Sequence, residues 1–230
     1  MEALLLAGGK GERLGAAAAG LPKPLVPLAG KPMAAYAVER LAAAGVARVI
    51  VACAAGQEPA FERELGGLGA EIVAVGEPEP LGRGGGLRLA AEARRESGPV
   101  YALNGDELFD ADLAALLAAH EEREPAASIV VCPLRSPFGI VELGDGDVVR
   151  RFRESPLLPH WVNAGLYVLG EEALARLPER GDHEETTFPD LAAEGRLLAY
   201  RHEGMWLTVN TPKDLRAAEE ALGSAAGAAP

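Results

Sequence analysis

The residues best suited to chemistry stand near the start of the chain, where glycines and basic side chains follow a short apolar run. The sequence reads LLLAGGKGERLG over residues 4–15, and Lys23 follows between two prolines. Glycines let a backbone approach a polyphosphate and turn its N–H groups toward the phosphate oxygens. Arg13 and Lys23 would add the positive charge that such oxygens need. The segment therefore predicts a phosphate-binding loop in a protein that handles nucleotides.

Two well-known phosphate loops do not describe this segment. A dinucleotide-binding loop has the pattern G-x-G-x-x-G, whereas the chain reads GGKGER from residue 8. A P-loop places Ser or Thr directly after Gly-Lys, but here Gly11 follows Lys10. A tight turn between a strand and a helix would account for the glycines, although not for Arg13 or for Lys23 between its prolines. The phosphate-binding interpretation is therefore the stronger of the two.

Oxygen donors that suit a metal ion occur in two further segments. Asn104, Gly105 and Asp106 follow an apolar run, and a carboxylate there matches the oxygen ligands that Mg²⁺ prefers. Alternatively, Asp106 belongs to a turn that caps the next helix. Its neighbours Glu107 and Asp110 are expected to be solvated or capping groups. The second segment reads WLTVNTPKDL over residues 206–215 and offers the amide oxygen of Asn210. Its Thr-Pro pair is also typical of a helix start.

Taken together, the glycine loop and the P-K-P motif resemble the signature of the sugar-1-phosphate nucleotidyltransferase family. The likeness extends over nearly the whole chain, to about Leu222, and is greatest to mannose-1-phosphate guanylyltransferases without the C-terminal β-helix domain. It implies an α/β fold, namely a Rossmann-like three-layer α/β/α arrangement around a mostly parallel sheet, with a small antiparallel sugar-binding lid. It also implies Mg²⁺ as the cofactor, with an NTP and a sugar 1-phosphate as substrates.

The resemblance also assigns roles to individual residues. Arg13 and Lys23 become catalytic, Arg13 on the departing phosphates and Lys23 near the α-phosphate and the attacking phosphate. Asp106 and Asn210 become the ligands of Mg²⁺. Nucleotide binding falls to nine residues: Leu6, Ala7, Gly8, Gly9, Lys10, Gly11, Glu79, Gly82 and Asp106. Sugar binding falls to three residues: Gly139, Glu154 and Asn163.

The chain departs from the family pattern at a few positions. Ser155 stands where relatives have a lysine that grips the sugar phosphate, and Arg151 or Arg153 would have to compensate. Thr208 replaces an aspartate, which leaves Asn210 as the second protein ligand. Arg83 replaces a threonine and either reaches a phosphate or lies in a solvent-facing loop. Such changes keep open a non-catalytic regulatory protein that binds an NDP-sugar.

The substrates are narrowed rather than fixed by these motifs. A carboxylate at the base edge, Glu77 or Glu79, would accept hydrogen bonds from guanine, which favours GTP. The similarity of EPLG over residues 79–82 and WVNAG over residues 161–165 to family motifs makes GTP with mannose 1-phosphate the first expectation. Glucose 1-phosphate with UTP or dTTP, heptose or amino-sugar phosphates, and phosphocholine with CTP remain alternatives. A molybdopterin-type nucleotidyltransferase is a further alternative because the chain reads VNTPKDL over residues 209–215.

The elements that must position these residues alternate along the first half of the chain. Apolar runs predict strands over residues 2–7, 48–53, 71–75, 100–103 and 128–132, with helices predicted over 33–44, 58–65, 84–96 and 112–122. Such alternation predicts βαβ units and a parallel sheet whose ligands bind beyond the carboxyl ends of the strands. After residue 133, short strands over 138–143, 148–152 and 161–169 predict the antiparallel lid.

Length and composition set the remaining limits. The chain has 230 residues, enough for one domain over residues 1–222, with a nucleotide-binding core to about 133 and a sugar-binding part from 134. Residues 223–230 are expected to form a disordered tail. The net charge of −12 disfavours nucleic-acid and membrane partners. Two cysteines in apolar runs and the lack of a signal peptide suggest a cytoplasmic protein, and a homodimer is one assembly left open. Four scattered histidines, His183 among them, are expected to be surface or hydrogen-bonded groups.

Overall fold

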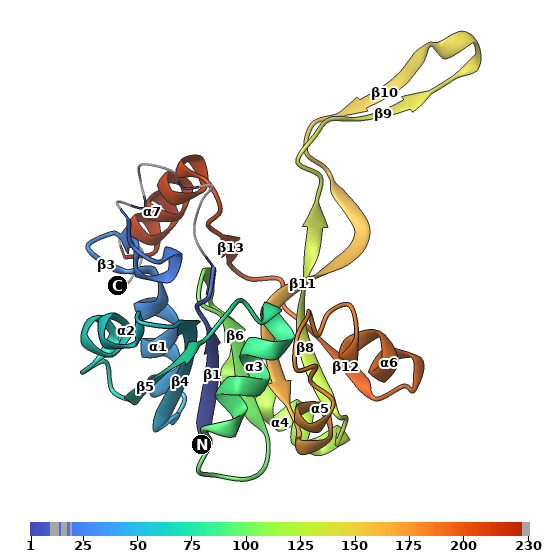
Figure 1. Cartoon of the computed structure of the whole chain (residues 1–230). Coiled ribbons are helices and arrows are strands. Elements are labelled where there is room, and N and C mark those ends of the chain that lie inside the picture. Colours follow the sequence, from blue (N-terminus) through green and yellow to red (C-terminus); the bar gives the residue numbers. More distant parts are fainter. Residues whose placement is uncertain (10–13, 15–17, 19, 227–230) are drawn as a thin grey trace.

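The computed structural model describes residues 1–9, 14, 18 and 20–226 (Figure 1). Three of the predicted site residues, Lys10, Gly11 and Arg13, lie outside this described part. Within it, no helix combines the length and the apolar character that a membrane span requires.

A seven-stranded sheet forms the centre of the molecule, and six of its strands run in the same direction (Figure 1). The exception, β11 (Leu157–Leu169), lies antiparallel between β6 and β8. Across the sheet the strands are β12 (Leu197–Arg201), β8 (Ala127–Arg135), β11, β6 (Val100–Asn104), β1 (Glu2–Leu6), β4 (Arg48–Ala54) and β5 (Glu71–Glu77). The predicted mostly parallel α/β fold is therefore confirmed.

Helices cover both faces of this sheet and make it the middle of three layers. One face packs on α1 (Met33–Ala43), α2 (Glu58–Leu65) and α4 (Leu113–Arg123). The other packs on α3 (Gly82–Glu92), α5 (Glu171–Ala175) and α6 (Thr187–Ala193). Successive residues of β1 alternate between the layers, because Ala3 and Leu5 join the first core whereas Leu4 joins the second. A strand covered on both sides explains the unbroken apolar runs of the sequence.

Short elements close the carboxyl edge of the sheet. The 3₁₀ turn Lys23–Leu25 leads to the small pair β2 (Pro27–Leu28) and β3 (Lys31–Pro32). The strand β7 (Glu107–Phe109) pairs in antiparallel fashion with β13 (Trp206–Thr208). This pairing brings the C-terminal motif beside the Asn104–Asp106 turn.

The helix α7 (Pro212–Ala226) follows β13 and packs on the β2–β3 region. It ends at Ala226, four residues beyond Leu222. The remaining tail residues lie outside the described part.

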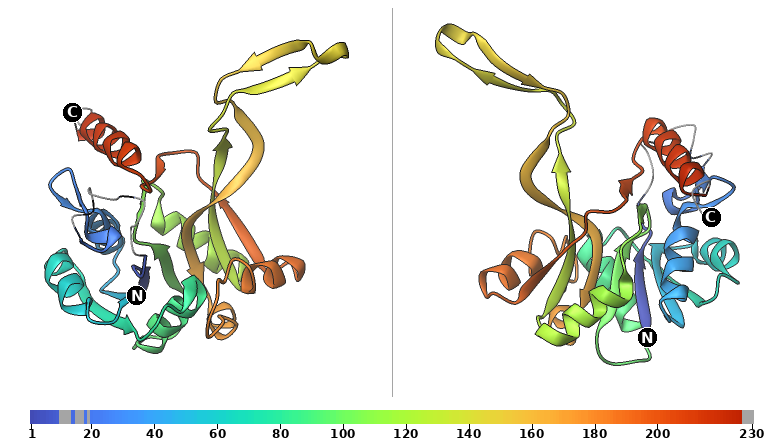
Figure 2. Two further views of the ribbon diagram at one scale, coloured as in Figure 1. Left: turned by 45° about the horizontal axis from the view of Figure 1, so that its top comes forward. Right: turned by 180° about the vertical axis from the view of Figure 1, so that it is seen from behind.

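A two-stranded arm projects from the body. It consists of β9 (Ile140–Leu143), the 3₁₀ turn Asp145–Asp147 and β10 (Val149–Arg153), and both views in Figure 2 show it standing clear of the sheet. The antiparallel pair was predicted, but the third predicted lid strand, residues 161–169, belongs to β11 in the central sheet. Its apolar pattern indicated a strand without revealing which strands it would pair with.

Candidate functional site

A cavity of about 530 Å³ opens at the carboxyl edge of the sheet, and we call it the strand-end cavity. The last residues of three parallel strands line it, namely Leu6 of β1, Glu77 of β5 and Asn104 of β6. This is the edge at which open α/β sheets bind their ligands. Of the predicted site residues, it gathers Leu6, Gly8, Gly9, Lys23, Gly82, Asp106 and Asn210.

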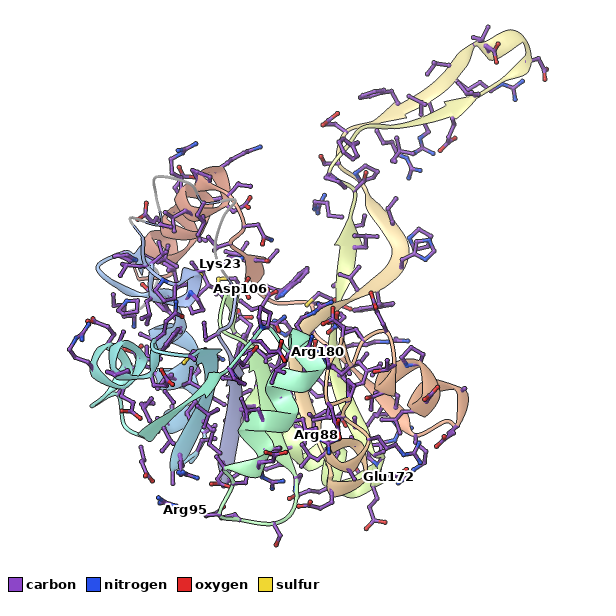
Figure 3. The ribbon with its side chains drawn as sticks, in the orientation of Figure 1. Lys23, Arg88, Arg95, Asp106, Glu172 and Arg180 are labelled. Carbon is purple, nitrogen blue, oxygen red and sulfur yellow. The ribbon has the colours of Figure 1, made fainter. Side chains whose placement is uncertain are left out.

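Lys23 stands at the centre of this cavity. Its ammonium group donates hydrogen bonds to the Asp106 carboxylate and, over 2.8 Å, to Oδ1 of Asn210. Figure 3 shows Lys23 and Asp106 side by side at the upper end of the sheet. The side chain of Lys23 is only 10% exposed, because the turn that begins at this residue directs it inward. A buried ammonium group held by two oxygen atoms favours the binding of negatively charged phosphates nearby.

Thr208 fixes the orientation of Asn210. The Asn210 amide donates from Nδ2 to Oγ1 of Thr208 over 2.9 Å, which leaves Oδ1 facing Lys23. The backbone N–H groups of Asn210 and Thr211 both donate to Asp214, over 3.0 and 2.8 Å, at the start of α7. The segment thus caps the helix and presents an oxygen donor at once, so the two predicted roles coexist.

The donors around Lys23 fit a magnesium ion. A carboxylate oxygen of Asp106 and the amide oxygen of Asn210 converge on one point that already holds a cation, and both are hard donors of the kind that Mg²⁺ prefers. No three His, Cys, Asp or Glu side chains in the described residues gather into a metal-binding group. Protein sites for Mg²⁺ use one or two such ligands and leave the others to water and phosphate. The donor set is therefore sufficient.

Glu107 is a site residue that the sequence interpretation missed. The prediction that it is solvated or caps a helix is wrong, because it is 8% exposed and lines the cavity. Burial, followed by the charge of Asp106, raises the pKa of Glu107 to about 8. Nε1 of Trp206 donates to its carboxyl group over 2.9 Å. The apolar residues that follow Glu107 in β7 were the available signal, since they draw its backbone into the protein.

The described part of the glycine loop packs closely on Glu77. A Cβ atom at Gly8 would lie 2.9 Å from Oε1 of Glu77, so only glycine fits there without a shift. The neighbouring Ala7 is buried and donates its backbone N–H to the carbonyl oxygen of Ala52 over 2.8 Å. Ala7 therefore lies behind the residues that line the cavity. Of the two carboxylates considered for the base edge, Glu77 lines the cavity. Glu79 is exposed and pairs with Arg180.

A second cavity, of about 570 Å³, adjoins the first, and we call it the side cavity. The two share Arg83, Asn104 and Glu107 in their walls. Asn163 lines the side cavity and donates to Oη of Tyr167 over 2.9 Å and to Oε1 of Glu184 over 2.8 Å. Glu184 is a second residue that the sequence did not single out. No local motif marks it.

Arg83 joins the wall of both cavities to the segment 181–184. It binds Asp182 through its backbone N–H and its guanidinium group, and it also forms an ion pair with Glu184. The hydrogen bond from Arg83, together with its charge, holds the pKa of Asp182 below its usual value against the effect of burial. Arg83 therefore lies at the site, where two carboxylates already neutralise it.

Two predicted sugar-binding residues lie elsewhere. Gly139 and Glu154 are neighbours at the base of the arm, since a Cβ atom at Gly139 would lie 3.0 Å from Oε2 of Glu154. Neither lines the strand-end cavity or the side cavity. Arg151 and Arg153, considered as substitutes for a lysine at position 155, form ion pairs with Glu142 on the arm. The sugar-binding role of these residues stays a prediction.

Comparisons with known proteins identify the family of this chain. A family model described as Nucleotidyl transferase matches residues 2–224. The mannose-1-phosphate guanylyltransferase catalytic subunit beta of Danio rerio is 36% identical over 225 residues, which cover 93% of this chain and 62% of that protein. The mannose-1-phosphate guanylyltransferase of Mycobacterium tuberculosis is 35% identical over 227 residues, with the same coverage. The chain thus spans about three fifths of the length of these curated relatives.

Solved structures share the fold. HddC from Yersinia pseudotuberculosis gives a TM-score of 0.74 at 22% identity, covering 96% of this chain and 99% of that one. The same protein complexed with GMP-PN gives a TM-score of 0.72 at 21% identity, with the same coverage. Both the family model and these structures cover nearly the whole chain. The chain belongs to the nucleotidyl transferase family.

Proposed function

We propose that the protein transfers a nucleotidyl group from an NTP to a sugar 1-phosphate and releases pyrophosphate. The observation that carries the proposal is the convergence of Lys23, Asp106 and Asn210 in a cavity at the strand ends. The names of the curated relatives make GTP and mannose 1-phosphate the first pair to test.

The nucleotide is assigned to the strand-end cavity. Gly8 and Gly9 line this cavity together with Lys23, and all three would face the phosphates. Glu77 is buried and sits in the wall with one carboxylate oxygen accepting from the backbone N–H of Leu81 over 3.0 Å. Its free lone pairs would accept from the N1 and N2 groups of guanine, which supports GTP over a pyrimidine nucleotide.

The sugar 1-phosphate is assigned to the side cavity. Its wall would offer the Glu184 carboxylate and the Asn163 amide to sugar hydroxyl groups, and it shares lining residues with the strand-end cavity that holds Lys23. Because the two cavities adjoin, an acceptor phosphate in the side cavity would lie near the α-phosphorus of the nucleotide. Holding two reactants at adjoining positions is itself a large part of catalysis.

The chemistry that follows is an in-line displacement. An oxygen of the sugar phosphate forms a bond to the α-phosphorus as the bond from that phosphorus to the pyrophosphate oxygen breaks. Lys23 stabilises the negative charge that gathers on the phosphate oxygens. Asp106 and Asn210 would hold Mg²⁺, which neutralises triphosphate charge when bound. No covalent intermediate on the protein is required.

Pyrophosphate release tests the proposal, measured with Mg²⁺ across a matrix of NTPs and sugar 1-phosphates. One preferred pair is expected, and Lys23→Met and Asp106→Asn should each lower its turnover by about 100-fold or more. Lys31→Met is the matched control, because Lys31 pairs with Glu39 outside both cavities. Near wild-type turnover in Lys23→Met contradicts the assignment. Silence across the matrix, with an NDP-sugar still raising the melting temperature, supports the regulatory alternative.

A cytoplasmic location is part of the same proposal. Cys53 and Cys132 are both buried and unpaired, as in proteins of reducing compartments.

A further inference from the structure

Arg83 stands where the two cavities meet. It lines both of them, and its side chain is 45% exposed. Among the described residues, Arg83 and Lys23 are the basic side chains that line the strand-end cavity, and Arg83 is the basic side chain that lines the side cavity. Lys23 is nearly buried and is held by Asp106 and Asn210. A ligand in the side cavity therefore meets Arg83 as its nearest available cation.

A sugar 1-phosphate brings a strong negative charge into the side cavity. A phosphate monoester carries about −1.5 to −2 charges at pH 7. The wall of the side cavity also contains the carboxyl groups of Glu107 and Glu184, which repel an anion when they are charged. The phosphate therefore needs a cation at this wall, and in the described part of the chain that cation is Arg83.

The guanidinium group of Arg83 has N–H groups to spare. Nε and Nη2 donate to Oδ2 of Asp182 over 3.2 and 2.8 Å, and Nη1 pairs with Glu184. A guanidinium group has five N–H groups, so these contacts leave one on each terminal nitrogen. Two such N–H groups form the fork that binds two oxygens of one phosphate. Arg83 can thus take up a phosphate without first leaving Asp182.

The two carboxylates that hold Arg83 also have other hydrogen-bond donors. Oδ1 of Asp182 accepts from the backbone N–H of Arg83 over 2.8 Å. Oε1 of Glu184 accepts from Asn163 over 2.8 Å and from Tyr167 over 3.0 Å. Each carboxylate keeps these donors when the guanidinium group turns part of its charge to a ligand. Because the Arg83 side chain is already fixed, little conformational entropy is lost when it binds an anion.

The other arginines considered for this phosphate lie elsewhere. Arg151 and Arg153 form ion pairs on the arm. Arg135 donates to the carbonyl oxygen of Ser155 over 2.7 Å. None of these three arginines lines the strand-end cavity or the side cavity. Their positions favour Arg83 for the acceptor.

We propose that Arg83 binds the phosphate group of the sugar 1-phosphate and holds it at the junction of the two cavities. This inference rests on the proposed function and adds a binding residue for the acceptor. Asp182 and Glu184 keep the guanidinium group at the junction before the acceptor arrives. Lys23 and the glycines after β1 then serve the phosphates of the nucleotide, and Arg83 serves the phosphate that attacks.

Steady-state kinetics with the preferred substrate pair tests the assignment. Arg83→Gln should raise the KM of the sugar 1-phosphate by about 10–100-fold, because hydrogen bonds between charged groups are lost, and it should leave the KM of the NTP nearly unchanged. Arg83→Lys should give an intermediate KM, since it keeps the charge without the fork. Arg88→Gln is the matched control. Arg88 lies on the same helix, is 40% exposed, pairs with Glu179 and lines neither cavity (Figure 3).

Asp182→Asn separates a phosphate contact from a purely structural role. The asparagine still offers an oxygen to the backbone N–H of Arg83 but no longer neutralises its guanidinium group. The KM of the sugar 1-phosphate should therefore fall by about 2–5-fold, the effect of one exposed ion pair. The same substitution in the Arg83→Gln protein should bring little of this gain. If Arg83 only held the segment 181–184 in shape, Asp182→Asn and Arg83→Gln would both raise the KM.

The possible outcomes distinguish this inference from the proposed function. A raised KM in both Asp182→Asn and Arg83→Gln overturns the phosphate contact, and so does a rise confined to the KM of the NTP. Unchanged kinetics in Arg83→Gln overturns the inference and leaves the proposed function intact. Melting temperatures verify that each variant is folded.

A wild type without turnover for any pair contradicts the proposed function, and calorimetric titration with mannose 1-phosphate then decides the binding role. Binding to the wild type and to Arg88→Gln, with loss of binding in Arg83→Gln, supports the assignment. No binding to the wild type, or equal binding to all three proteins, overturns it.

Discussion

Replacing His183 by phenylalanine should make the protein less sensitive to acid. The side chain of His183 has no exposed surface, and neither ring nitrogen meets a hydrogen-bond partner in the described part of the chain. Its ring packs edge-on against Tyr167 and Phe188, with centroid distances of 5.3 and 4.7 Å. This corrects the expectation of a surface or hydrogen-bonded histidine. A phenylalanine ring would keep these aromatic contacts without a titratable group.

The size of the effect follows from the pKa of His183. Burial, followed by the positive charge of Arg83, lowers this pKa from 6.5 to about 4. Between those values the unfolded chain binds a proton at His183 that the folded protein excludes. The free energy of unfolding therefore keeps its full value above pH 6.5 and falls as the pH decreases toward 4. Each pH unit in this window costs about 1.4 kcal/mol, which gives a loss of about 2 kcal/mol at pH 5.

Urea unfolding at pH 8 and pH 5 measures this loss directly. The free energy of unfolding of His183→Phe relative to the wild type should rise by about 2 kcal/mol between the two pH values. Any misfit of the larger ring affects both values equally and cancels. The same substitution at the exposed His160 controls for the chemical change. A difference that is the same at pH 8 and pH 5 would refute the argument that burial keeps His183 uncharged.

Acid should also affect the site through the same residue. His183 stands between Asp182 and Glu184, which bind Arg83 and Asn163 in the wall of the side cavity. A charged ring at position 183 would push this segment out of its buried position. The side cavity is therefore expected to lose its shape before the rest of the fold, which protection of these backbone amides from hydrogen exchange at pH 5 would reveal.

Substitutions at three further positions test the packing around the sheet and the site. Glu2→Ala removes a buried carboxylate that accepts from Arg48 over 2.9 Å, so the free energy of unfolding should fall by about 3 kcal/mol or more; an unchanged urea midpoint contradicts this. Gly85→Ala places a Cβ atom 2.6 Å from the carbonyl oxygen of Glu179. The clash should cost about 1–3 kcal/mol, which exceeds the gain of about 1 kcal/mol in helix propensity, so the melting temperature should fall. A higher melting temperature would be inconsistent with this packing. Glu107→Gln should change stability little at pH 7, because a carboxyl group with a pKa of about 8 is mostly neutral there. Glu107→Ala should lower the free energy of unfolding by about 2 kcal/mol or more. Equal melting temperatures for the two variants would count against a neutral buried carboxyl group.

The sequence by itself determined the sheet edge at which the site forms. Apolar runs that alternate with helical patterns indicate parallel strands covered on both faces, and Gly8 and Asp106 each follow such a run. The carboxyl ends of parallel strands meet at one edge, so local patterns were enough to place both motifs there. The metal-binding and catalytic roles of the residues at this edge came from the family resemblance.

Only the tertiary structure decided which side chains meet at that edge and which do not. Lys23 reaches Asp106 across 83 positions of sequence and Asn210 across 187, and the second contact depends on the pairing of β13 with β7. Glu184 joins the side cavity from a segment without a motif, whereas Glu154 lies beside Gly139 at the base of the arm and lines neither cavity. Local periodicity reports which face of an element is buried. It contains no information on the partner, because strand pairing and loop closure join residues that are distant in the chain.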